Sequence, residues 1–205
     1  MNAKFYLLTV LIPLLSLHST LAARVLEKVV VGQDVYKAPE PGQVSMEGFL
    51  GNRMEISREG RLKRHTYQED RLLAGFRKRP GSDSWHKSLN AAYAGEFVGK
   101  WLHSATLALE NKPNDTVLAE RIQQIANGLM DCQMKDGYLG TYLKKNRWKS
   151  KFEHGWDVWV HKYVLIGLLS YYRCTGDERA LETCQQVGDL LIETFGDDKR
   201  DILKS

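Results

Sequence analysis

The sequence predicts a mainly α-helical protein built from helical hairpins that form part of an α/α toroid, with a short strand-and-loop segment at the amino terminus. Two observations lead to this prediction. One predicted helix is apolar on two sides, and pairs of helices recur at a fixed interval along the 205 residues. A helix of the first kind must be covered on both sides, and stacked pairs of helices provide that cover.

The stretch WDVWVHKYVLIGLLSYYRCTGD, residues 156–177, is the helix that is apolar on two sides. At 3.6 residues per turn, Trp156 and Trp159 fall on one side and His161 falls on the other. The following stretch, 178–195, carries glutamate and glutamine along one face, which is typical of an outer helix in contact with water. We therefore predict that the first helix is an inner one, which packs on outer helices and also faces a central lumen.

Helical hairpins repeat along the chain. The stretches LAERIQQIANGLMD (118–131) and ALETCQQVGDLLIE (180–193) share a glutamate, a glutamine pair and a leucine at an offset of 62 residues. The same offset pairs Asp115 with Asp177, each placed to cap the helix that follows, and Gly176 is placed to end the preceding helix. Repeats bury their faces on neighbouring repeats, so two hairpins cannot close a ring. We expect this sequence to be an incomplete amino-terminal portion of a larger α/α domain.

The first 22 residues have the pattern of a secretory signal peptide. Lys4 is followed by the apolar run FYLLTVLIPLLSL, and small residues around Ala22 offer a cleavage site. The run is too short to span a bilayer as a helix, although an uncleaved anchor is the alternative. We expect residues 1–22 to be removed, which predicts a secreted or periplasmic protein without a stable membrane anchor.

Residues 23–66 are predicted to be a lead-in of strands and loops, and residues 67–205 to be the helical domain. β-Branched residues alternate in VLEKVVVGQDVY (25–36), and APEPGQ (38–43) has the composition of a turn. Within the helical domain, the predicted helices span 67–77, 91–110, 116–133, 157–174 and 178–195.

Charge and cysteine content exclude two classes of site. The net charge of +4 at pH 7 is spread along the chain, which argues against a nucleic-acid-binding surface. Cys132, Cys174 and Cys184 form no cysteine and histidine cluster with the spacing of a structural zinc site. We therefore predict no nucleic-acid partner and no metal ligands within this chain.

Several segments, in order, resemble one family of enzymes. They are GEFVGKWLHSATLAL (95–109), QMKDGYLGTY (133–142) and the helix at 156–177, supported by FLGNRMEISREGRL, LLAGFRKRPGSDSW and GDDKRDIL. Together they resemble the amino-terminal part of secreted glycoside hydrolases of the β-L-arabinofuranosidase type, glycoside hydrolase family 127 (GH127) and its relatives. The likeness covers residues 47–205. It implies an (α/α)6 barrel that acts on a carbohydrate substrate, followed in full-length members by β-sandwich domains.

The resemblance also implies where the catalytic groups lie. In characterised members the implied nucleophile is a cysteine thiolate held on zinc, with a glutamate as acid/base, and both belong to a later part of the barrel. Cys132, Cys174 and Cys184 match neither motif. We therefore predict no catalytic residue and no cofactor within this chain, zinc being implied only for the missing portion, and no turnover by these 205 residues. The alternatives are a non-catalytic glycan-binding or structural fragment, and a polysaccharide lyase or epimerase on the same toroid.

Seven residues are candidates for contact with a sugar. Trp156 and Trp159 offer apolar platforms, each with an indole N–H, unless they are core aromatics that fill the lumen. Asp136 and Tyr138 follow Gln133 in a glycine-flanked turn that either reaches the cleft or is held by an aspartate side-chain turn. The complete set is Trp156, Trp159, Asp136, Tyr138, Gln133, His103 and His161.

The two histidines have alternative interpretations. His161 lies on the opposite side of its helix from the tryptophans, so a packed, hydrogen-bonded histidine is the alternative there. His103 follows Glu96 and Lys100 at i, i+4 and i+7, which predicts either a lumen-facing polar network or an exposed ladder of ion pairs.

One departure from the family pattern bears on the sugar. Arabinofuranosidase-type members carry His-x-x-Tyr and then Gly-His in the counterpart of the 156–177 helix. Here the aligned positions are Trp156, Trp159 and Tyr163. We therefore expect a related pocket that recognises a sugar other than arabinose.

Overall fold

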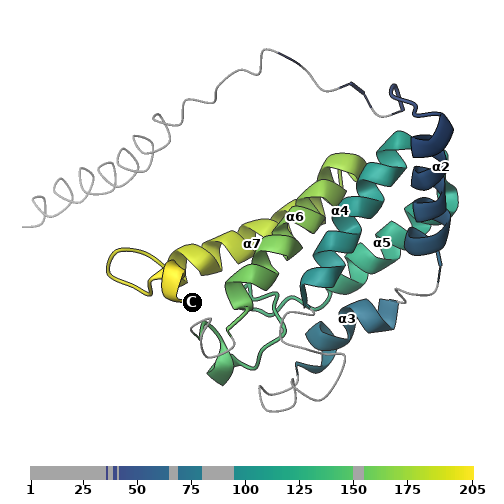
Figure 1. Cartoon of the computed structure of the whole chain (residues 1–205). Coiled ribbons are helices and arrows are strands. Elements are labelled where there is room, and N and C mark those ends of the chain that lie inside the picture. The colour runs from purple at the N-terminus through teal and green to yellow at the C-terminus, as the bar shows by residue number, and fades with distance from the viewer. Residues whose placement is uncertain (1–35, 37–38, 41, 65–68, 80–94, 150–154) are drawn as a thin grey trace, which may run out of the picture. The chain divides into compact units, whose positions relative to one another are not determined.

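The computed structural model describes residues 36, 39–40, 42–64, 69–79, 95–149 and 155–205. Most of these residues lie in helices. The main helices are α2 (Gly48–Ser57), α3 (Glu69–Lys78), α4 (Glu96–Asn111), α5 (Thr116–Met130), α6 (Asp157–Thr175) and α7 (Glu178–Thr194) (Figure 1). Short turns are the π-helical η1 (Arg58–Leu62) and the 3-10 helices η5 (Lys144–Asn146) and η7 (Ile202–Lys204). The mainly α-helical prediction is confirmed. The predicted signal peptide, 1–22, and residues 25–35 of the predicted strand lie outside the described residues.

Helices α4 and α6 lie side by side and make the most extensive helix contact in the described structure (Figure 1). Two glycines allow this approach. A Cβ atom on Gly99 would lie 2.0 Å from the carbonyl oxygen of Tyr163, and a Cβ atom on Gly167 would lie 2.7 Å from the carbonyl oxygen of Gly99. The two backbones therefore touch at a point where no larger residue fits.

Helices α5 and α7 complete two hairpins, α5 with α4 and α7 with α6. Their amino termini confirm the 62-residue repeat, because each begins after a capping aspartate at equivalent positions. Asp115 accepts a hydrogen bond from the N–H of Leu118, and Asp177 accepts one from the N–H of Arg179, each at 3.1 Å. Gly176 ends α6 with φ +73°, as predicted.

Helix α6 is buried on one side and largely exposed on the other. The buried side consists of Asp157, Val160, His161, Val164, Gly167, Leu168 and Tyr171. On the other side, Trp159 and Leu169 remain 40% and 39% exposed. The buried stripe therefore lies between the two predicted apolar sides, because Val160 and Gly167 come from the tryptophan side and His161 and Leu168 from the other.

The predicted strand-and-loop lead-in, 23–66, is wrong over its second half, because α2 and η1 form a helix from residue 48 to residue 62. Arg58 and Leu62, four residues apart, are the buried residues of this segment. The Arg58 guanidinium donates 3.0 Å to the amide oxygen of Asn111 at the end of α4. The helix forms because this side docks on α4, a contact that local β-propensity does not report.

The other predicted helices agree with the structure except at their ends. The helix predicted at 116–133 ends at Met130, and the one predicted at 178–195 ends at Thr194. The expected starts at residues 67 and 91 lie outside the described residues. None of the described helices is long and apolar enough to cross a membrane.

The glycine contact predicts opposite effects for two substitutions to alanine. Gly99→Ala should lower the free energy of unfolding by about 1–3 kcal/mol, because the added methyl group overlaps the α6 backbone. Gly188→Ala in α7 is the matched control, since a Cβ atom there meets nothing within 4 Å. It should raise stability by about 0.5–1 kcal/mol. Denaturant unfolding followed by circular dichroism measures both, and equal effects would contradict the contact.

Candidate functional site

Three aromatic side chains form a row on the exposed side of α6, and we call Trp156, Trp159 and Tyr163 the aromatic row. The ring centroids of Trp156 and Trp159 are 6.2 Å apart, and those of Trp159 and Tyr163 are 5.3 Å apart, both edge to face. Positions 156, 159 and 163 share one helix face because they are three and four residues apart. Trp156 and Trp159 are 36% and 40% exposed, so the row offers apolar surface to a ligand.

Helix α4 supplies the polar partners of the aromatic row. The carboxylate of Glu96 accepts a hydrogen bond from the indole N–H of Trp159 and forms a 2.7 Å ion pair with Lys100. The Lys100 ammonium also lies 4.4 Å from the ring centroid of Tyr163. The predicted i, i+4 ion pair therefore exists and reaches across to α6, where it fixes the orientation of Trp159.

A second ammonium group lies against the aromatic row. The Lys162 nitrogen is 3.6 Å from the ring centroid of Trp159 and 4.2 Å from that of Tyr163. Both distances are within the range of cation–π attraction. The row therefore combines apolar rings with two ammonium groups.

His103 lies farther along α4 and binds α6. Its Nδ1 atom is 2.7 Å from the hydroxyl of Ser170, which itself donates to the carbonyl oxygen of Ile166 at 2.8 Å. Because the single hydroxyl proton of Ser170 is used in that bond, His103 donates through Nδ1. This candidate is half-buried and links the two helices.

The loop before α6 is held by the buried carboxylate of Asp157. The Tyr138 hydroxyl donates to Oδ1 of Asp157 at 2.5 Å, and the N–H of Trp148 donates to Oδ2 at 2.8 Å. The N–H of Tyr142 in turn donates to the Tyr138 hydroxyl at 3.1 Å. Burial raises the pKa of Asp157 to about 6 and raises that of Tyr138 well above its usual value. The candidate Tyr138 is itself fully buried and binds the loop to the start of α6.

His161 is fully buried beneath the same loop. Its Nε2 atom accepts a hydrogen bond from the N–H of Leu139 at 3.3 Å, so Nδ1 carries the proton and donates to the carbonyl oxygen of Asp157 at 2.7 Å. Burial lowers the pKa of this imidazole to about 4, which keeps it neutral at pH 7. Its position matches the alternative interpretation, a packed and hydrogen-bonded histidine.

The remaining loop candidates bind the loop to itself and to α7. Asp136 accepts from the N–H of Tyr138 at 3.4 Å and pairs with Arg147 at 2.8 Å, which matches the alternative of an aspartate turn. The Gln133 amide donates to the carbonyl oxygens of Gly137 at 3.1 Å and Thr183 at 2.9 Å. Both side chains support the loop that precedes α6.

The structure thus separates the seven candidates. It brings Trp156 and Trp159 together at the surface, places His103 between α4 and α6, and gathers the other four around the loop. Sequence reasoning missed Asp157 and Arg147, which hold that loop from beneath. The signal for Asp157 was available, because an acidic residue in the first helical turn is favoured by the helix dipole.

The described residues contain no cluster of side chains that could bind zinc. Their histidine, cysteine, aspartate and glutamate side chains form no group of three that could hold a metal ion. The three cysteines are free, and burial raises the pKa of each thiol.

Comparison with known proteins adds the family to this geometry. The profile of the "Beta-L-arabinofuranosidase, GH127 catalytic domain" family matches residues 46–205. A 106-residue stretch is 28% identical to the non-reducing end β-L-arabinofuranosidase of Bifidobacterium longum subsp. longum, and covers 48% of this chain and 16% of that protein.

Two solved structures resemble the fold. A GH127 β-L-arabinofuranosidase from Geobacillus stearothermophilus T6 superimposes with a TM-score of 0.51 at 21% identity, over 75% of this chain and 24% of its own length. A second GH127 β-arabinofuranosidase gives a TM-score of 0.62 at 20% identity, over 79% of this chain and 28% of its own. These likenesses confirm the predicted fold class, part of an α/α barrel. The chain spans 16% of the curated relative and 24% and 28% of the two solved structures.

Asp157 and His161 make opposite contributions to the pH dependence of stability. The folded-state pKa of Asp157, about 6, lies above its ordinary value of 3.8, so the folded state gains protons, and stability, as the pH falls from 6 to 4. The folded-state pKa of His161, about 4, lies below its ordinary value of 6.5, so the unfolded state gains protons and stability falls. The two contributions nearly cancel between pH 4 and 6.5.

Removing either group should expose the other contribution. Asp157→Asn should lose about 2–3 kcal/mol of stability between pH 6.5 and pH 4, whereas His161→Gln should gain stability over the same range. The unsubstituted chain should change little. Denaturant unfolding at several pH values measures this, and parallel profiles for the three proteins would contradict the assignment.

Proposed function

Because the chain belongs to the GH127 catalytic-domain family of β-L-arabinofuranosidases, we propose that it forms part of the sugar-binding wall of a glycoside hydrolase that acts outside the cytoplasm. The membership implies a carbohydrate substrate. The exposed aromatic row on α6 is the observation that carries the proposal for this chain. The signal-like residues 1–22, which lie outside the described structure, support the location.

The chemistry of the row suits a sugar ring. A pyranose or furanose ring presents C–H groups on its faces and hydroxyls around its edge, so it binds flat aromatic surface flanked by polar groups. Trp156 and Trp159 supply exposed aromatic surface, and the ammonium donors of Lys162 and Lys100 lie over the rings of Trp159 and Tyr163. Glu96 fixes the indole of Trp159, so the platform is pre-organised before a ligand arrives.

The proposal assigns no catalytic residue to the chain. Glycoside hydrolysis usually needs a general acid and a second group across the anomeric carbon. Glu96 lies beside the row, but its carboxylate already binds Lys100 and Trp159 and therefore acts as a positioning group. We propose that the nucleophile, the acid/base and the zinc ligands implied by the resemblance come from residues outside the described part of this chain.

The sugar is proposed to differ from arabinofuranose. The resemblance places a histidine, a tyrosine and a second histidine of the arabinofuranosidases where this chain has Trp156, Trp159 and Tyr163. Trp156 and Tyr163 thus replace hydrogen-bonding imidazoles with aromatic stacking surface. A non-catalytic glycan-binding fragment remains the second candidate, because the aromatic row serves binding with or without turnover.

Removal of one ring tests the sugar platform. Trp159→Ala should weaken binding of a neutral oligosaccharide by about threefold to tenfold, since an aromatic contact contributes on the order of 1 kcal/mol. Leu169→Ala is the matched control, because Leu169 is equally exposed on the same helix. Trp159→Phe, which keeps a ring but loses the N–H, should give an intermediate value. Isothermal titration against a panel of pentose and hexose oligosaccharides measures this, and equal affinities of the two alanine variants would reject the platform.

Turnover separates the enzyme from the binding fragment. The 205-residue chain should release no product from aryl pentosides and hexosides, because none of its described residues supplies a nucleophile and acid pair. Absorbance of the released phenol is the measurement. Release above the rate in buffer, and its loss in Glu96→Gln, would show instead that Glu96 is catalytic.

A further inference from the structure

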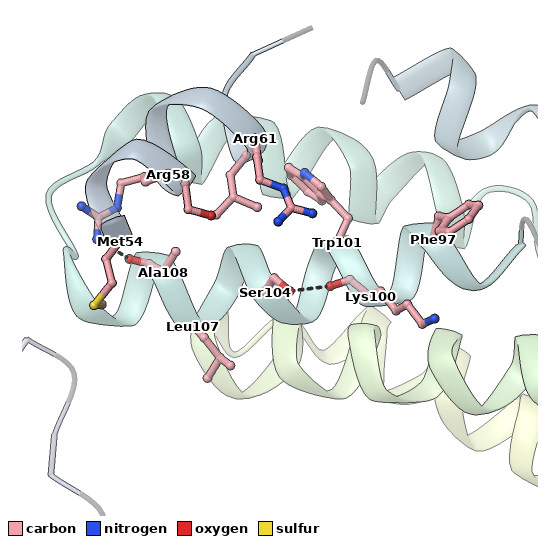
Figure 2. Close-up of a pocket in the computed structure, with 11 residues that line it drawn as sticks. Met54, Arg58, Arg61, Phe97, Lys100, Trp101, Ser104, Leu107 and Ala108 are labelled. Carbon is pink, nitrogen blue, oxygen red and sulfur yellow. Dashed lines mark hydrogen bonds between the residues drawn. The ribbon is translucent and has the colours of Figure 1, made fainter. Parts of the chain in front are cut away.

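A groove of about 490 Å³ lies between the α2–η1 helix and α4, apart from the loop network and beside the aromatic row. Figure 2 shows its two walls, with Met54, Arg58 and Arg61 from one helix and Phe97, Lys100 and Trp101 from α4. Its volume is in the range of sites that hold small ligands.

The groove carries positive charge that the protein does not fully neutralise. None of the described residues that line it is acidic, and three of them are cationic. Glu55 pairs with Arg58 and Glu96 pairs with Lys100, both from outside the lining. Arg61 is exposed and has no ion-pair or hydrogen-bond partner among the described residues. Its guanidinium points from η1 toward α4 (Figure 2).

The walls of the groove also contain apolar surface and unused donors. Phe97 is 41% exposed, and Trp101 forms part of the wall with only 4% of its surface exposed. The indole nitrogen of Trp101 and the Nε atom of Arg58 are buried without a hydrogen-bond partner. The groove therefore combines apolar side chains with cationic ones.

We propose that this groove binds an anionic substituent of an acidic glycan, a carboxylate or a sulfate ester, with Arg61 as the main contact. A guanidinium presents two parallel N–H groups to either anion. Phe97 provides apolar surface for the sugar ring that carries the substituent. The sugar part of the ligand rests on the proposed function.

Lys100 connects the groove with the aromatic row, because it lines the groove and also lies over Tyr163. One oligosaccharide can therefore contact both, with a charged residue in the groove and a neighbouring sugar on Trp159. Together, three helices that are separate in sequence, α2–η1, α4 and α6, form this extended surface.

The test compares three ligands of the same length by isothermal titration with the 205-residue chain. They are a uronic-acid oligosaccharide, its neutral methyl ester, and a sulfated neutral oligosaccharide. A charged ligand should bind about tenfold more tightly than the ester, since hydrogen bonds to charged groups are the stronger ones. The preference should shrink between about 50 and about 500 mM salt. Whichever charged ligand binds more tightly identifies the anionic group.

Two variants locate the effect. Arg61→Gln should reduce the preference for the charged ligand to about that of the ester, while binding of the ester stays unchanged. Arg173→Gln, which removes the same charge from an exposed position at the end of α6, should leave the preference intact. Equal affinities for charged and neutral ligands, or an equal loss of charge preference in the two variants, would overturn the proposal that the groove binds an anion.

The two proposals fail separately in this experiment. If the charge preference disappears in Arg61→Gln but Trp159→Ala binds all ligands normally, the groove stands and the sugar platform falls. If Trp159→Ala weakens the neutral ester while charge brings no advantage, the platform stands and the groove is rejected.

Discussion

The backbone contact between α4 and α6 is the constraint on which the other features depend. Gly99 and Gly167 let the helices approach until a single added methyl group would overlap main-chain atoms. At this separation side chains on one helix reach the other, as His103 reaches Ser170 and Trp159 reaches Glu96. Larger residues would move the helices apart and break both bridges. The close approach at the two glycines therefore sets the positions of the side chains around the aromatic row.

A buried carboxylate fixes the end of α6 from which the aromatic row begins. Asp157 accepts from the Tyr138 hydroxyl and the Trp148 N–H, and it holds Trp148 in the left-handed region, at φ +59°. That conformation costs a non-glycine residue about 1–2 kcal/mol, which hydrogen bonds to a charged acceptor can offset. Desolvation of the same carboxylate opposes its ionisation and raises its pKa to about 6. The buried Asp157 carboxylate therefore lowers the free energy of unfolding at neutral pH, but its hydrogen bonds fix the conformation of the loop beside Trp156.

Support and recognition are divided between different parts of the molecule. The loop at 133–149 is packed inward, on α7 through Gln133 and over His161, so its polar groups serve the fold. Recognition is left to helix faces, where Trp159 and Lys100 are held by bonds between helices. Side chains on helices are placed more accurately than those on free loops, which favours a pre-organised sugar surface.

Local patterns in the sequence determined the helices from α3 to α7, the caps at Asp115 and Asp177 and the left-handed end at Gly176, because each depends on residues within a turn or two. The repeat was visible because the same local pattern recurs 62 residues later. Tertiary structure decided the rest. The sequence shows two apolar sides of α6 but not which of their residues are covered, since that depends on how closely α4 approaches. Nor does local propensity reveal that 48–62 is helical, because its stability comes from docking Arg58 on the end of α4. The inward position of Tyr138 follows from its bond to Asp157, 19 residues away, and a contact of this kind leaves no periodic trace in sequence. For His161 the helical period indicated the opposite side from the tryptophans, but only the tertiary structure shows the loop that covers it.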